Sequence, residues 1–269
     1  MVMNPRNLLV VASFTLAASS MSPATAADVA KPATAGQPSA DAVLKQMSDT
    51  LAAAKQFSFK GTRQFSSAQA EGRNMQAKSD IEVTVRRPDH LTGTSTGDGN
   101  VRRMIFDGKN FTLLDGKTNM YSTVPMRASL DALPGQLAKK YGLVPPLADF
   151  VQSNPYKDLK RRSQSVTYLG TVACGTPATH CHRLGLSGKL ADGELWIGVA
   201  DHLPKKLTAK VKGGTDTGAD LTIDFTDWNL APAVTAETFV FTPPKDAQKI
   251  RMVTSAEIDA AWAKSAPTK

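Results

Sequence analysis

The sequence predicts a mainly β protein of the α+β class: a curled antiparallel sheet that forms an unclosed half-barrel, with helices over its concave face. Three observations support this prediction. Apolar and polar residues alternate with a period of two in roughly ten short segments. Short turn sequences join most of these segments, which favours antiparallel pairing. Helical spacing occurs near each end of the chain and once in its middle, and a long antiparallel sheet must curl or split.

The N-terminus predicts a targeting segment. Residues 1–26 contain one charged residue, Arg6, and a largely apolar run at 8–16. Small residues follow at Ala24-Thr25-Ala26, so we expect a signal peptide that is cleaved before Ala27. Serines and threonines interrupt the apolar run too early for a transmembrane anchor. The expected location of the mature chain is the periplasm, as a soluble protein.

The rest of the chain is expected to hold one folded domain. Residues 27–39 are rich in Ala, Pro, Ser and Thr and predict a flexible leader. Residues 40–264 predict a single domain, long enough to bury a substantial core. Ser39 is expected to cap the first helix, because an apolar stripe follows it at helical spacing. That stripe contains Val43, Leu44, Met47, Leu51 and Ala54.

Strands are expected from Phe57 onward. The first two each have one apolar face, made by Phe57, Phe59, Phe65, Ile81, Val83 and Val85. Three short strands follow at 101–106, 111–114 and 120–124. Two tight-turn sequences separate them, Asp107-Gly108-Lys109-Asn110 and Asp115-Gly116-Lys117-Thr118. We therefore expect an antiparallel meander in this part of the chain.

A helical insert is expected at 126–151. Its apolar residues at helical spacing are Leu130, Leu133, Leu137 and Tyr141. Either Ser129 caps this helix or Pro134 begins it. Pro145-Pro146 interrupts the insert, and a further short helix is expected at 147–151. The insert is compatible with a movable lid as well as with a fixed cover.

Strands resume after the insert, at 166–173, 181–186, 195–199, 207–211 and 221–226. An aromatic strand is expected at 239–241, closed by Pro243-Pro244. Ser255 is expected to cap a last helix, which carries Ile258, Ala261 and Trp262.

The chain is basic, with 32 Lys and Arg, 24 Asp and Glu, and a formal charge of +8. Basic residues occur as scattered doublets: Arg86-Arg87, Arg102-Arg103, Lys139-Lys140 and Lys205-Lys206. One triplet is present, Lys160-Arg161-Arg162. We interpret these residues as a solvated face, with attraction to anionic lipid head groups as the alternative. Nucleic acid is not an expected partner, because no aromatic residues are interleaved with the basic clusters.

The two cysteines, Cys174 and Cys181, predict a disulfide in an exported chain. A register that places them opposite each other would set Val172 beside Arg183, so we expect a bulge or an atypical register. A zinc site built from these thiols with His180 and His182 is the alternative. Strand geometry argues against it, since His180 and His182 would lie on the face opposite Cys181. No metal and no cofactor are expected.

No catalytic set is evident. The segment 185–188 lacks the G-x-S-x-G spacing of a nucleophile elbow. Asp224 and Asp227 would face opposite sides of a strand, and the acids at 192 and 194 lie beside a glycine turn. We therefore expect a protein that is not an enzyme. An enzyme would need either an acid pair or the pair His180 and His182 to converge in a pocket.

The apolar strand residues are candidates for either a core or the lining of a ligand site. Ten of them share the apolar side of their strands: Phe57, Phe59, Ile81, Val83, Leu195, Ile197, Leu207, Leu221, Ile223 and Phe225. A few amphipathic helices must cover this wide surface. Incomplete cover would leave an apolar cavity, the usual form of a small-molecule site.

The segment 221–250 resembles the C-terminal signature of a bacterial family of predicted periplasmic proteins of unknown function. That family is similar to the LolA/LolB lipoprotein-carrier superfamily. The matching features are the signal peptide, the first helix through Gln56, the strand at 57–59, the DGKN hairpin at 105–111 and the ending Phe239-x-Phe241-x-Pro243-Pro244. The resemblance implies an unclosed barrel whose apolar interior accepts acyl chains in the carriers. The Cys174–Cys181 hairpin and the insert at 126–151 have no match there, and no catalytic residue is implied.

These observations predict a monomeric periplasmic binding protein that holds an apolar small molecule or lipid between sheet and helices. The alternative is an envelope interaction or sensor protein, in which the interior is filled by its own side chains and a surface binds a membrane-protein partner.

Overall fold

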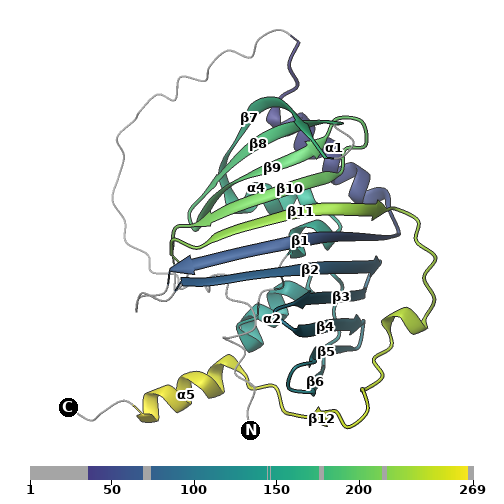
Figure 1. The fold of residues 1–269 in the computed structure, drawn as a ribbon, viewed down its shortest axis with the longest axis vertical. Coiled ribbons are helices and arrows are strands. Elements are labelled where there is room, and N and C mark those ends of the chain that lie inside the picture. Colours follow the sequence, from purple (N-terminus) through teal and green to yellow (C-terminus); the bar gives the residue numbers. More distant parts are fainter. Residues whose placement is uncertain are drawn as a thin grey trace.

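The structure is a computed structural model that describes residues 36–68, 74–143, 145, 147–175, 179–213 and 217–265. The predicted signal peptide and most of the predicted leader lie outside these residues. The described part contains one sheet of twelve strands in the order β12-β6-β5-β4-β3-β2-β1-β11-β10-β9-β8-β7 (Figure 1). All neighbours pair antiparallel except β12 and β6, which are parallel. The edge strands β12 and β7 do not pair with each other, so the sheet is unclosed, as predicted.

The strands are longer than the sequence pattern indicated. They are β1 (Gln56–Ala68), β2 (Asn74–Arg86), β3 (His90–Gly97), β4 (Asn100–Asp107), β5 (Asn110–Asp115), β6 (Met120–Pro125), β7 (Ser163–Cys174), β8 (Thr179–Gly188), β9 (Ala191–Gly198), β10 (Pro204–Val211), β11 (Asp220–Asn229) and β12 (Gln248–Lys249). Strands β1 to β6 and strands β7 to β11 each pair in chain order, and β1 pairs with β11 at the centre.

Helices lie behind the sheet in the view of Figure 1. They are α1 (Ala40–Ala53), α2 (Leu133–Tyr141), α3 (Ala148–Val151) and α4 (Pro155–Arg162). Helix α5 (Ser255–Ser265) contacts α2 and lies below the sheet in the same view. The main core forms between the sheet and α1 to α3, and its cluster of buried residues draws on nearly every strand. The predicted fold class, a mainly β half-barrel with helices over one face, is confirmed.

Helix α1 forms where the sequence predicts it. The hydroxyl of Ser39 accepts a hydrogen bond from the amide of Ala42 at 3.1 Å, which caps the helix. Asp41 lies in the first turn, where its charge is favourable to the helix dipole. The predicted stripe is buried against the sheet, and Leu44 and Leu51 are each 0% exposed.

Three differences from the sequence prediction have clear physical reasons. Strand β3 was missed because it is rich in Thr, Ser and Gly, and only Leu91 in it is buried. Helix α4 was missed because its eight residues contain one buried leucine, Leu159. The cap of α5 is Thr254 and not Ser255: the hydroxyl of Thr254 accepts from the amide of Glu257, whose carboxylate accepts from the amide of Thr254.

The segment after β11 forms a strap, residues 230–253, and not the predicted aromatic strand. Residues Glu237–Phe239 form a short 3₁₀ helix, η2, which lies against β3 and β4. Phe239 is 1% exposed, beneath the guanidinium of Arg86 at 4.8 Å and beside the ring of His90 at 5.2 Å. Prolines on both sides of Phe239 disfavour a strand, because proline cannot donate to a ladder. The strap runs past one end of strands β1 to β6 and includes β12 at the edge of the sheet (Figure 1).

The strap covers a second, smaller apolar surface. Alternate residues of β4 point to opposite faces of the sheet, and Phe106 faces the main core. Ile105 therefore faces the other side, where η2 lies, and it is 3% exposed. Leu114 of β5 is 5% exposed and also lies outside the main core cluster. The sheet thus has cover on its convex face as well, at β3 to β6.

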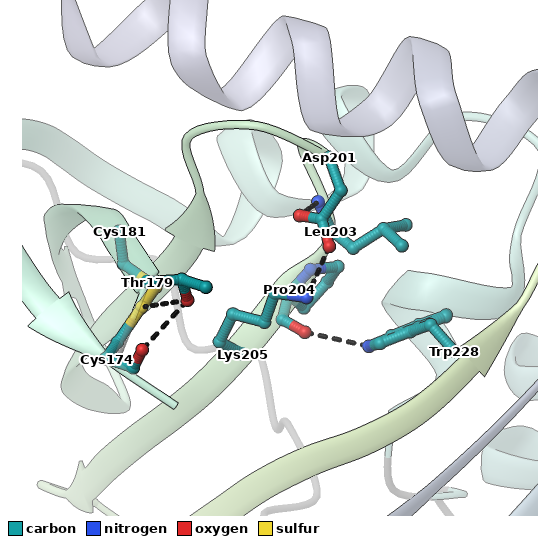
Figure 2. Close-up of a disulfide and its surroundings, with 8 residues drawn as sticks. All are labelled: Cys174, Thr179, Cys181, Asp201, Leu203, Pro204, Lys205 and Trp228. Carbon is teal, nitrogen blue, oxygen red and sulfur yellow. Dashed lines mark hydrogen bonds and ion pairs between the residues drawn. A yellow bond between two sulfur atoms is a disulfide. The ribbon is translucent and has the colours of Figure 1, made fainter. Parts of the chain in front are cut away.

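The cysteine hairpin resolves the predicted conflict of register. Cys174 and Cys181 form a disulfide with a Cα–Cα distance of 5.9 Å, yet they are not directly opposite each other. Cys174 pairs with Thr179, and Cys181 pairs with Val172. The register shifts between Tyr168 and Thr171, so the expected irregularity is present. Figure 2 shows the disulfide beside Thr179, whose hydroxyl donates to the Cys174 carbonyl at 2.9 Å.

A polar network closes the turn between β5 and β6. The carboxylate of Asp115 accepts hydrogen bonds from the Asn100 amide at 3.0 Å, from the Thr118 backbone at 3.0 Å and from Arg102 Nε at 3.2 Å. Burial alone would raise the pKa of Asp115, but these donated bonds outweigh it and lower the pKa. The network therefore favours the charged form of Asp115.

Loss of the disulfide should lower the free energy of unfolding by about 2.5 kcal/mol, the loop-closure entropy of so short a loop. Urea unfolding of the wild type with and without reductant measures this change, and a Cys174→Ser/Cys181→Ser double variant is the control, since reductant should not affect it. Equal stability of the wild type under both conditions would contradict the prediction.

Phe239→Ala should destabilise the protein by about 3–5 kcal/mol, because it leaves a cavity under the strap. Val240→Ala is the matched control, since Val240 is 58% exposed and adjacent. Chemical denaturation of both variants measures the difference. If both variants lose a similar, small amount of unfolding free energy, the strap is not held on the sheet by Phe239.

Asp115→Asn should destabilise the protein at neutral pH by about 1–3 kcal/mol, as one partner of a charge-assisted network is lost. The folded pKa of Asp115 lies below its unfolded value. Its contribution is therefore present above about pH 4 and is lost as the pH falls toward the folded pKa. Unfolding free energies of wild type and variant should converge in acid, and a constant difference down to pH 2 would contradict the assignment.

Candidate functional site

The ten apolar residues predicted to line a ligand site lie together on the concave face. Seven are buried, with at most 8% exposed: Phe57, Phe59, Ile81, Leu195, Ile197, Ile223 and Phe225. The other three, Val83, Leu207 and Leu221, are partly buried against the same cluster. The antiparallel registers of β1, β2, β9, β10 and β11 place them side by side. Their contact with a ligand stays a prediction.

An aromatic group forms the centre of this surface. Phe225 of β11 lies edge-on to Phe59 of β1 at 5.5 Å and to Phe150 of α3 at 5.5 Å. Trp228 lies 4.5 Å from Phe59, and its ring nitrogen donates to the Pro204 carbonyl at 2.8 Å (Figure 2). Edge-on aromatic pairs contribute about 0.5–1.5 kcal/mol beyond the area that they bury. Helix α3 is thus held on the sheet by packing.

A small cavity lies next to this group, between β2 to β4 and the insert that carries α2 and α3. Its volume is about 30 Å³. All the side chains around it are apolar: Val83, Leu91, Met104, Leu130, Leu133, Pro134, Pro145, Leu147, Ala148 and Val151. Of the ten residues predicted to line a site, only Val83 borders it. Leu91 was not predicted as a lining residue because strand β3 was not predicted. The lining residues from 130 to 151 belong to the insert, which was expected to be a lid or a fixed cover.

The cover over the cavity contains a strained connection. Helix α2 ends at Tyr141, and its C-cap Gly142 has φ +64°, a left-handed conformation that glycine adopts easily. Leu147 has the same φ of +64° just before α3, where a branched side chain makes this conformation costly, by about 1–3 kcal/mol. Such strain persists only where the surrounding structure holds it in place. The strained residue borders the cavity directly.

Arg87 joins the cover to the rest of the fold. Its guanidinium donates to the Val151 and Gln152 carbonyls at the end of α3, at 2.8 and 2.9 Å. It also donates to the Ala54 and Leu51 carbonyls at the end of α1, at 3.2 and 3.4 Å. The ring of Phe57 lies 5.5 Å below the cation. Burial lowers the pKa of Arg87, and the negative charge of Asp131 partly offsets this effect.

The interpretation of the basic doublets as a solvated face is wrong for Arg86 and Arg87. Arg86 covers Phe239, and Arg87 lies between two helix ends whose free carbonyls carry partial negative charge. Spacing along the sequence could not show this, because the acceptors are backbone atoms of distant segments. The triplet is the last turn of α4, and each member pairs with an acid: Lys160 with Asp41, Arg161 with Asp158 and Arg162 with Asp149.

The predicted histidine pair lies away from the cavity. His180 is exposed, and His182 is half-buried with its Nδ1 3.0 Å from the Tyr168 hydroxyl. Burial, and then the charge of His202, lower the pKa of His182, so its neutral form is favoured. The candidate acids also form pairs on the sheet surface: Asp192 with Lys212, Glu194 with Arg183, and Asp224 with Lys206. None of these side chains borders the apolar cavity.

Two features are absent from the described residues. No group of three or more His, Cys, Asp or Glu side chains within them is arranged to hold a metal ion. No helix among them combines the length and the apolar character needed to cross a membrane.

Solved structures with a similar arrangement have low sequence identity. A DUF1329 family protein from Desulfovibrio piger is 7% identical, with 75% of this chain and 95% of that chain covered and a TM-score of 0.36. A chain in the MucA/MucB complex of Pseudomonas aeruginosa is 17% identical, with 76% and 61% covered and a TM-score of 0.35. A LolA superfamily protein from Nitrosomonas europaea is 12% identical, with 76% and 99% covered and a TM-score of 0.33.

A comparison with curated proteins found no match to the sequence. A family model does match, over residues 40–253, and its description is "Predicted periplasmic protein (DUF2092)". The match spans α1, all twelve strands, the insert and the strap. The chain therefore belongs to the DUF2092 family of predicted periplasmic proteins.

Proposed function

We propose that the protein is a non-catalytic periplasmic binding protein that holds a lipid or an acyl chain between the concave face and helices α2 and α3. The observation that carries this proposal is the cavity bordered only by apolar side chains, contributed by both the sheet and the insert. An acyl chain needs no polar contact to bind there, since each buried methylene contributes about 0.8 kcal/mol. The predicted lining residues extend the apolar surface from this cavity across β1 and β11.

The cavity must enlarge before a ligand can enter. Its volume of about 30 Å³ is small beside the roughly 300–1,000 Å³ of typical ligand pockets. The insert can move without breaking the sheet, because α2 and α3 contribute no ladder hydrogen bonds. We propose that Arg87 holds the closed position through its bonds to the end of α3, and that strain at Leu147 favours release.

The second candidate function is an envelope interaction or sensor protein that binds a membrane-protein partner. The small volume of the cavity favours this alternative, since the interior is already largely filled by the protein's own side chains. Native mass spectrometry of full-length protein exported to the periplasm and purified without detergent separates the two. A bound mass that releases a phospholipid or acylated species supports lipid binding. An unliganded mass that stays unchanged after incubation with lipid vesicles, together with a co-purifying protein, supports the alternative.

Ala148→Leu should reduce the lipid retained on purification several-fold, because it adds side-chain volume where α3 borders the cavity. Ala52→Leu is the matched control, since Ala52 is on the exposed face of α1 and should retain lipid like the wild type. The measurement is the lipid-to-protein ratio by native mass spectrometry. Equal retention by both variants would place the ligand elsewhere.

Arg87→Gln should lower the free energy of unfolding by about 2 kcal/mol, because it removes charge-assisted bonds to four carbonyls. If Arg87 holds the insert closed, hydrogen exchange in 147–152 should accelerate more than exchange in β1. Arg161→Gln is the control, as its ion pair on α4 is largely exposed and contributes little. Uniform acceleration across the protein would mean that Arg87 serves global stability alone.

A further inference from the structure

One arginine interrupts the apolar rows of the concave face. Arg63 lies on β1, on the same side as Phe57 and Phe59, because strand residues alternate. Its direct neighbours are Ile223 on β11 and Ser79 on β2. Ile223 is 0% exposed and Ser79 is 7% exposed, so the charge sits beside buried side chains. A lysine or arginine in such a row is unusual unless it is paired.

Arg63 has no such pairing within the described part of the chain. Its Nε atom is buried without a hydrogen-bond partner there, and so is the hydroxyl oxygen of Ser79 directly opposite. Burial lowers the pKa of Arg63, and the positive charge of Arg102 lowers it further. Buried polar groups almost always have partners, and an unpaired buried charge is costly. Two such atoms in one cross-strand pair indicate a place that accepts a polar ligand.

Arg102 supplies a second guanidinium at this place. It lies on β4 in register with Ser95 of β3, which in turn pairs with Ile81 of β2. Its side chain is 43% exposed, and its Nε donates to Asp115 at 3.2 Å. With Asp115 counted, the group of Arg63, Arg102 and Asp115 carries a net charge of +1. The residues between the two arginines have short side chains or none: Ser79, Ser95 and Gly97. Gly97 packs directly on Ser79.

This polar group adjoins the apolar cavity. Val83 and Met104 border the cavity and lie in register through Gly93. The next row toward the β1–β2 turn contains Ile81, Ser95 and Arg102. Two residues along a strand correspond to roughly 6.6 Å. The concave face therefore has an apolar region, with the solvent-accessible Arg102 one row away and the partly buried Arg63 two rows away.

We propose that Arg63 and Arg102, with Ser79, bind the anionic head group of an amphipathic ligand, a carboxylate or a phosphate, whose chain lies against the apolar interior. This inference rests on the proposed binding of an acyl chain and specifies the chemistry of the ligand. The head group would accept hydrogen bonds from guanidinium and hydroxyl donors, and its charge would offset the uncompensated charge of Arg63.

The test titrates delipidated full-length protein with palmitate and with 1-hexadecanol, which has the same chain length and a neutral head. Arg63→Gln should weaken palmitate binding roughly tenfold or more, the loss expected for a charge-assisted contact, and change hexadecanol binding less than twofold. The ligand-free variant should melt no lower than the wild type, because a partly buried charge whose Nε has no hydrogen-bond partner among the described residues has been removed. Arg63→Lys should recover part of the palmitate affinity.

Arg103→Gln is the matched control. Arg103 carries the same charge one residue from Arg102 but on the opposite face of β4, so neither ligand should bind differently. An equal loss for both ligands in Arg63→Gln, or a lower melting temperature without ligand, would overturn the inference and leave acyl-chain binding standing. Failure of both ligands to bind the wild type would overturn the proposed function and this inference with it. If inorganic phosphate binds as tightly as palmitate, the acyl chain adds nothing to affinity, and the proposal that the ligand is amphipathic would be wrong.

Discussion

The fold depends on covering one apolar face of a sheet that does not close. A closed barrel would bury its interior by itself, whereas this sheet leaves its concave face to helices. Helix α1 covers one part with a stripe of fully buried residues, and the insert with α2 and α3 covers another. The two covers differ in how they are attached. Helix α1 runs directly into β1, while the insert connects β6 to β7 and lies on the sheet by packing.

Arg87 matters because it connects these two covers to one another. Arg87 follows β2 and is part of neither helix, but its guanidinium donates hydrogen bonds to carbonyls at the ends of both α1 and α3. Five donors in a fixed planar arrangement suit this task better than the single ammonium of a lysine. The contacts are to backbone atoms, so the covering helices can differ in side chains without losing them. Opening of the insert would expose these carbonyls to water and would leave α1 in place.

Much of the fold could be predicted from the sequence, because alternation and turn chemistry are local. The meander from β4 to β6 followed from two turns, and Asp107 accepts from the amides of Lys109 and Asn110 as such turns require. Strand β3 could not be predicted in this way, since its neighbours β2 and β4 hold it in place despite weak alternation. The strap shows the same limit: Phe239 looks like a strand residue, but its burial depends on Arg86 and His90, far away in the sequence.

The candidate site was less predictable than the fold. The apolar strand residues were placed on the correct face, yet the cavity is bordered mostly by residues of the insert, whose position over β2 to β4 no local pattern encodes. Arg63 also lay outside any motif. Arg63 is in the same alternating phase as Phe57 and Phe59, which puts a charged residue on the apolar face of the strand. This mismatch was the one sequence signal that could have marked Arg63 as a candidate site residue.

The pairing of β1 with β11 has a consequence for how the chain folds. Residues from β1 to β6 form one set of neighbouring strands in chain order, and residues from β7 to β11 form another. Each set can form from contacts between adjacent segments, but the seam between them joins Ser58 to Asn229 and Phe65 to Leu221. Contacts so distant in sequence carry a large loop-closure cost and slow folding. During synthesis, β1 must therefore keep one backbone edge unpaired until the chain has been made as far as β11.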